Sequence, residues 1–199
     1  MSRRRLQTFL GLTLGGVLLA LSGNALEAQQ DFSSANKERG RAAVEYRDAD
    51  IHTVAAYYYS QRNHESRWLL IEAGISTDDL ETINRNAIAL RTPQGREVPL
   101  ATQRRIGEDV NRIEQLLQNA GVVSHNVVSY FPQRDRAESM RLFTLPFGGV
   151  VSDDFVVDRH RVAVGPLFFE APTGAWEKGT YSLIVRHEKG TAELPIHLE

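Results

Sequence analysis

Short apolar runs separated by Gly, Pro and polar residues fill most of the chain from Ala42 onward. Val, Ile, Phe and Tyr are frequent in these runs, which is typical of strands bounded by turns. Many short strands in succession predict a sandwich or barrel and argue against an alternation of strands and helices. The runs before the closing hairpin are 54–60, 68–75, 86–91, 97–100, 122–131, 139–145, 155–157, 161–164 and 167–170.

One hairpin is marked by the turn sequence Thr92-Pro93-Gln94-Gly95. Proline fixes its own φ near the value of the second turn position, and glycine suits the turn exit. We therefore expect the strands on either side of this turn to pair.

A single amphipathic helix is predicted near residues 103–120. Its apolar residues recur three and four positions apart, which is the spacing of one helix face. Gly121 suits its end, and Thr102 could cap an early start that would place Gly107 inside the helix. The predicted buried stripe contains Ile106, Val110, Ile113, Leu116, Leu117 and Ala120.

The closing hairpin begins with an acid-x-Gly-x-Tyr-x-apolar motif from Glu177 to Leu183, and its strands end at His187 and Leu198. This motif resembles the E–F corner of immunoglobulin-like sandwiches, in which the tyrosine hydroxyl bonds to main chain just upstream. The resemblance implies this role for Tyr181, a tight turn at Gly179, and an immunoglobulin-like antiparallel sandwich of about seven to nine strands with one inserted helix. An ordinary hairpin that closes any sandwich is the alternative.

Residues 1–28 have the order of a secretory signal peptide: arginines at 3–5, an apolar stretch to about Leu21, and small residues around Ala25 and Ala28. Glycines interrupt the apolar stretch, so it is weaker than the roughly 20 apolar residues of a permanent span. We expect cleavage after Ala28 or Ala25, with an uncleaved anchor as the alternative. The sequence then predicts a flexible leader over 29–41, one domain over 42–199, and no transmembrane span after signal removal.

Composition excludes several function classes. The net charge is −2 for the whole chain and about −4 without the signal segment, so there is no basic footprint for nucleic acid. The chain has no cysteine, which excludes disulfides, zinc–thiolate sites, a cysteine nucleophile and a lipidated signal. These features favour a periplasmic or secreted bacterial protein, and the chain also resembles secreted bacterial domains of uncharacterised activity. A eukaryotic secretory origin fits the same features.

The densest group of potential metal ligands is Asp153, Asp154, Asp158 and His160. Asp158 and His160 are two residues apart, so on a strand they would share a face. Carboxylates with one imidazole can hold a divalent cation. The alternative interpretation is a polar turn followed by a solvated strand edge.

Other catalytic signals are weak. The six histidines (His52, His64, His125, His160, His187 and His197) include no helical zinc pair, although His187 and His197 could lie close together in the closing hairpin. There is no Gly-x-Ser-x-Gly elbow and no phosphate loop around Gly148-Gly149. No cofactor is predicted.

Three adjacent tyrosines, Tyr57, Tyr58 and Tyr59, lie in a predicted strand. Side chains alternate between the faces of a strand, so at least one must point away from the core. An exposed tyrosine combines apolar area with a hydroxyl, which suits an interface. A strand covered on both faces is the alternative.

The favoured function is a non-catalytic periplasmic or secreted binding or assembly module that acts through protein–protein contacts, with another envelope protein as partner. Sheet edges beside aromatic residues suit strand addition. One alternative is a small periplasmic enzyme or metal-binding protein that uses residues 153–160. Another is a purely structural accessory domain, and the oligomeric state is left open.

The signal prediction is tested by the intact mass of the exported protein. The mature chain should begin immediately after Ala25 or Ala28. A chain that still begins at Met1 or Ser2 would contradict export with cleavage.

Overall fold

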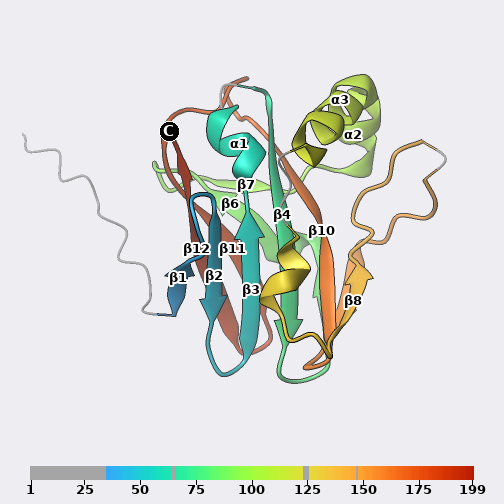
Figure 1. The fold of residues 1–199 in the computed structure, drawn as a ribbon. Helices are drawn as coiled ribbons and strands as arrows, with labels where there is room; N and C mark the ends of the chain where they lie inside the picture. The colour runs from blue at the N-terminus through green and yellow to red at the C-terminus, as the bar shows by residue number, and fades with distance from the viewer. Residues whose placement is uncertain (1–34, 64–65, 123–125, 147) are drawn as a thin grey trace, which may run out of the picture. The chain divides into compact units, whose positions relative to one another are not determined.

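The computed structural model describes residues 35–63, 66–122, 126–146 and 148–199, so the predicted signal segment lies outside the described residues, as do His64 and His125. The described chain is mainly β, with several antiparallel sheets and few helices (Figure 1). No helix in these ranges combines the length and apolar character needed to cross a membrane.

The largest sheet has six strands in the order β1-β2-β3-β4-β10-β8. Neighbouring strands in this sheet are antiparallel except β8 and β10, which are parallel, so the antiparallel prediction holds only in part. Part of the predicted leader is a strand, because β1 pairs with β2. The strands are β1 (Asn36–Glu38), β2 (Ala43–Arg47), β3 (Ile51–Ala56), β4 (Trp68–Thr77), β10 (Arg161–Glu170) and β8 (Arg136–Ser139).

A second sheet has four strands in the order β12-β11-β6-β7, and a third consists of β5 and β9. The described residues therefore contain more strands than the seven to nine expected, because short strands such as β1 and β5 carry little sequence signal. The strands of these sheets are β12 (Gly190–Leu198), β11 (Gly179–His187), β6 (Ile88–Arg91), β7 (Glu97–Pro99), β5 (Glu81–Asn84) and β9 (Asp154–Val157).

The main core lies between the six-stranded and four-stranded sheets. Its buried side chains come from both, for example Ile71 on β4 and Leu183 on β11. A second apolar layer lies where β4 and β10 contact the helices through Trp68 and Phe168, so these two strands are buried on both faces. Burial on both faces explains why their sequences are continuous apolar runs.

The predicted helix is present but divided into α2 (Gln103–Glu108) and α3 (Val110–Gly121). Thr102 caps α2 by accepting the Arg105 N–H at 3.2 Å. The break is at Asp109, whose carboxylate accepts the Trp68 indole N–H at 2.7 Å. The buried face of the two helices is formed by Ile106, Ile113, Leu116 and Ala120, while Val110 and Leu117 are only partly buried.

Three strand predictions are wrong in detail. Residues 126–131 contain the 3-10 helix η2 (Val127–Tyr130), and only Ser139 of the predicted run 139–145 lies in a strand. Runs 161–164 and 167–170 form the single strand β10, which continues through Pro166. Its partner β8 ends opposite Val164, so Pro166 has no neighbouring strand on that side and its missing N–H costs no ladder bond there.

The turn prediction is confirmed. β6 and β7 pair across residues 92–95, and Gly95 adopts a φ of +83° and donates its N–H to the Thr92 carbonyl at 2.9 Å. Left-handed φ values of this kind favour glycine.

The closing corner also has the expected contacts. The Tyr181 side chain is buried, and its hydroxyl donates to the Glu177 carbonyl at 3.0 Å. Trp176 packs edge-on against its ring at 5.5 Å. Gly179 has a φ of +149°, and a Cβ at this position would lie 2.9 Å from Pro93 Cγ. Glycine at 179 therefore lets β11 start close to the β6–β7 turn.

The hydrogen bond at the closing corner allows a prediction of how much stability the Tyr181 hydroxyl contributes. Tyr181→Phe should lower the free energy of unfolding by about 1–2 kcal/mol, because the Glu177 carbonyl loses a buried donor. Tyr59→Phe is the control, since the Tyr59 hydroxyl has no hydrogen-bond partner among the described residues, and its cost should stay under about 0.5 kcal/mol. Urea unfolding measures both, and equal stabilities for the two variants would contradict the role of this hydrogen bond.

Candidate functional site

The four side chains predicted as metal ligands, at 153, 154, 158 and 160, do not come together around one point. Asp153 lies 3.1 Å from the Arg85 guanidinium, and Asp158 accepts the His160 main-chain N–H at 2.8 Å. Asp154 accepts the Ser152 hydroxyl at 3.0 Å. The His160 ring instead lies 3.5 Å from the Asp135 carboxylate.

Within the described ranges, no group of three or more Asp, Glu or His residues is arranged to hold a metal ion. The contacts of these acidic residues are those of loop caps and counter-ions, which corresponds to the polar-turn interpretation.

The buried Arg85 accounts for the position of Asp153. Its side chain is buried and donates to the carbonyls of Ala101, at 2.6 Å, and Leu142. Asp153 supplies the counter-charge for this arginine. One guanidinium therefore holds together three segments that are distant in the sequence.

The tyrosine run is not a strand, which corrects the predicted 54–60 run. β3 ends at Ala56, Tyr57 is buried after it, and Tyr58 and Tyr59 begin the short helix α1 (Tyr58–Arg62). The helix is held by Ser60, whose hydroxyl donates to the Leu70 carbonyl at 2.7 Å. Tyr58 and Tyr59 are partly buried against apolar clusters, so the argument from alternating faces does not apply.

His187 and His197 are half-buried strand residues of the closing hairpin and do not lie close together. His187 is opposite Gly190 beside the turn, whereas His197 is opposite Thr180 at the far end. His197 Nδ1 lies 3.1 Å from the Thr180 hydroxyl.

His52 is the buried histidine of the large sheet. Its Nε2 lies 2.7 Å from the Glu45 carboxylate, which also contacts Arg39, and its ring packs against Phe131. Burial lowers the pKa of His52, although the Glu45 charge opposes this shift; Arg47 and Arg39 lower the pKa further. The neutral imidazole is therefore favoured in the folded protein.

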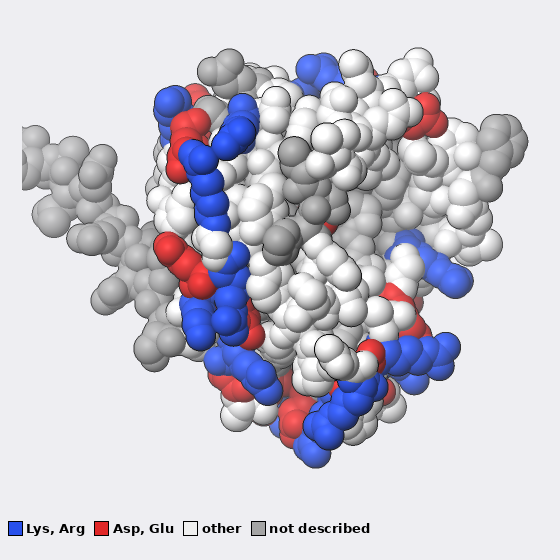
Figure 2. Space-filling view, in the orientation of Figure 1, with Lys and Arg blue, Asp and Glu red and all other residues white. Residues whose placement is uncertain are grey.

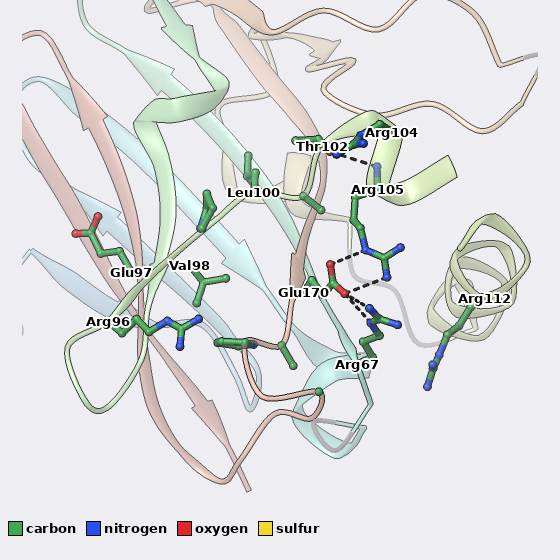
Figure 3. Close-up of a pocket in the computed structure, with 15 residues that line it drawn as sticks. Arg67, Arg96, Glu97, Val98, Leu100, Thr102, Arg104, Arg105, Arg112 and Glu170 are labelled. Atoms are coloured by element: carbon green, nitrogen blue, oxygen red, sulfur yellow. Dashed lines mark hydrogen bonds and ion pairs between the residues drawn. The ribbon is translucent and has the colours of Figure 1, made fainter. Parts of the chain in front are cut away.

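One candidate site is a pocket of about 850 Å³ between the β6–β7 turn, the start of α2 and the end of β10 (Figure 3). This volume is within the range of ligand pockets. Five arginines and two glutamates line it: Arg67, Arg96, Arg104, Arg105, Arg112, Glu97 and Glu170. Apolar residues form the rest of the wall, mainly Val98, Pro99, Leu100, Ala101, Ala171 and Pro172.

Glu170 anchors two of these arginines. Arg105 donates to both of its carboxylate oxygens, at 2.8 and 3.0 Å, and Arg67 donates to one of them at 2.6 Å (Figure 3). The hydrogen bond from Arg105 is the main cause that lowers the pKa of Glu170. Burial opposes it, and the hydrogen bond from Arg67 lowers the pKa further. Arg105 also lies over the Trp68 ring, with 5.6 Å between its guanidinium carbon and the ring centroid. Glu170 is thus a fixed internal counter-ion.

The other three arginines have no such anchor. The side chains of Arg96, Arg104 and Arg112 make no hydrogen bond or ion pair with any residue in the described part of the chain. They come from the β6–β7 turn, α2 and α3, and Figure 3 shows them spread around the Glu170 group. Glu97 is paired with Arg186 at 2.7 Å, so the pocket retains an excess of positive charge.

This arrangement is suited to binding an anion. Guanidinium groups bind carboxylates and phosphates in a bidentate manner, and the apolar wall can accept an aliphatic neighbour of the charge. Sequence reasoning did not find the site because its arginines are scattered from residue 67 to residue 112 and converge only in the fold. The available signal was the Arg104-Arg105 pair directly after a helix cap at Thr102.

The charge on the rest of the surface is mixed. On the face shown in Figure 2, Lys and Arg side chains lie beside Asp and Glu side chains, and the centre of the face is largely uncharged. On this face no continuous basic surface is visible.

Comparison of the chain with protein-family models, with curated proteins and with solved structures finds no match. The site has to be interpreted from its own geometry.

Because His52 is buried, we expect the free energy of unfolding to decrease in mild acid. Its folded pKa lies below the unfolded value of about 6.5, so the unfolded chain takes up the proton first. The free energy of unfolding should therefore fall as the pH drops below about 6.5, down to the folded pKa. Urea titrations between pH 7.5 and about 5 measure this slope.

His52→Gln should reduce that slope. Identical pH slopes for the parent and His52→Gln would refute the assignment to His52.

Proposed function

We propose that this protein is a non-catalytic binding or assembly module of the bacterial periplasm or extracellular space. It binds a partner protein, another component of the envelope, through the arginine pocket. The observation that carries the proposal is the set of three arginines (Arg96, Arg104 and Arg112) that line one pocket without an acceptor in the described part of the chain.

Charge balance supports an acidic ligand. Glu170 is fully engaged by Arg67 and Arg105, and Glu97 is engaged by Arg91 and Arg186. An incoming carboxylate can therefore pair with free guanidinium groups and does not need to displace an internal pair. Hydrogen bonds to charged groups contribute about 1.5–3 kcal/mol each when well formed.

The residue types around the pocket support binding rather than chemistry. Among the described residues, its lining contains no Asp, His, Lys, Ser or Tyr that could act as nucleophile or general base. The Thr102 hydroxyl is engaged as a helix cap, and Glu170 is held ionised by arginines.

We also propose that the fold is an immunoglobulin-like sandwich. The buried Tyr181, its bond to the Glu177 carbonyl and the left-handed Gly179 support this proposal, because they are the contacts of the E–F corner. Such sandwiches commonly bind partners through their strand edges and their end loops.

Binding of a synthetic peptide tests the proposed function. A soluble peptide of alternating Glu and Val should bind the purified mature chain in isothermal titration calorimetry at low ionic strength. Arg104→Gln and Arg112→Gln should each weaken binding about tenfold, which corresponds to about 1.4 kcal/mol. Added salt should weaken it as well, because the contact is ionic.

Arg134→Gln is the matched control, because Arg134 is exposed and lies outside this pocket. Its affinity should equal that of the parent. Absence of binding, or equal losses in all three variants, would refute the pocket as the binding site.

A further inference from the structure

Strand β7 is an edge of the four-stranded sheet and lies in the wall of the arginine pocket. It pairs with β6 on one side and with no other described strand. Residues 96–102, which include all of β7, line the pocket without interruption. The pocket therefore runs along a strand edge.

The free main-chain groups of this edge follow from the register. Thr92 donates its N–H to the Arg96 carbonyl at 2.8 Å, and hydrogen-bonded pairs alternate in an antiparallel ladder. Leu90 and Val98 are then the next bonded pair. The N–H and carbonyl of Glu97 and the carbonyl of Pro99 point away from β6, towards the open edge.

The open part of this edge is at Glu97 and Pro99, because Ala101, two residues further on, donates its N–H to the Phe168 carbonyl of β10 at 2.9 Å. Val98 is buried in the main core, so it does not cover the main chain of β7, and Glu97 is turned towards Arg186. The edge of β12, in contrast, is covered, because Asn36 donates to the Glu193 carbonyl at 2.9 Å. An uncovered edge is a template for another strand.

We propose that the pocket takes an extended acidic segment of the partner protein, which adds to β7 as a further strand. This inference rests on the proposed function and specifies its ligand and its binding mode. In an extended segment alternate residues share a face, so acidic side chains at every second position point to one side. Those side chains contact Arg96, Arg104 and Arg112, while the segment's main chain pairs with Glu97 and Pro99.

Charge complementarity favours a peptide over a membrane or a polyanion. Arg96, Arg104 and Arg112 line one pocket beside a strand edge, and the chain as a whole is acidic. A membrane or nucleic acid is held by a broad basic surface, whereas a strand edge supplies main-chain bonds that only a polypeptide can complete.

N-methylated peptides test the binding mode. In the bound Glu–Val peptide, the amides of one residue type, either all Glu or all Val, face β7, and those of the other type face away. Methylation of the facing set should weaken binding at least tenfold, and methylation of the other set should change it less than threefold. Calorimetry with the two methylated peptides, one methylated at Glu and one at Val, measures the difference.

Hydrogen exchange gives an independent measurement on the protein itself. The Glu97 amide should exchange at least tenfold more slowly when the unmodified peptide is bound, because it becomes a donor in the new ladder. The Gln94 amide in the exposed turn is the control and should keep its rate.

The outcomes separate the two proposals. Equal binding of both methylated peptides, with an unprotected Glu97 amide and a continued dependence on Arg104 and Arg112, would refute strand addition and leave the proposed function intact. Failure of the unmodified peptide to bind would refute both. Arginine-dependent binding to phosphatidylglycerol vesicles, together with weaker binding to the peptide, would overturn the peptide assignment in favour of a membrane.

Discussion

The pairing of β4 with β10 is the constraint on which the rest of the structure depends. The two strands run antiparallel with Leu69 opposite Phe169 and Ala163 opposite Ile75, and both are buried on their two faces. One face forms the main core with the second sheet, and the other receives α2 and α3. Because Glu170 is opposite Trp68 at the end of this ladder, the same register places the counter-ion of the arginine pocket beside the ring that Arg105 covers.

Features that depend on local sequence could be predicted. The turn at 92–95 follows from Pro93 and Gly95, and the corner at Tyr181 follows from a motif in which donor and acceptor are four residues apart. The helix was also predicted, because a stripe at helical spacing needs no distant partner. Its division at Asp109 could not be predicted, because the carboxylate is held by the distant Trp68 indole.

Features that depend on distant partners could not be predicted. Asp153 and Asp158 are close in the sequence and suggested a common ion, but each is engaged separately, by Arg85 and by the main chain of its own turn. The tyrosines after Ala56 have strand-like composition, yet the Ser60 bond to Leu70 stabilises a helical turn there. The arginine pocket is the extreme case, since the fold assembles it from residues that carry no motif.

The contact between Asn36 and Glu193 has a consequence for folding kinetics. It joins strand β1, near the start of the described chain, to the final strand β12, and Gln61 similarly reaches Glu199. Contacts of such large sequence separation raise the contact order, and a high contact order slows folding. The two sheets can close only after the last strand is available, so the chain stays open while it is synthesised. The same delay would serve the export proposed for this chain, because a translocation channel passes an unfolded polypeptide.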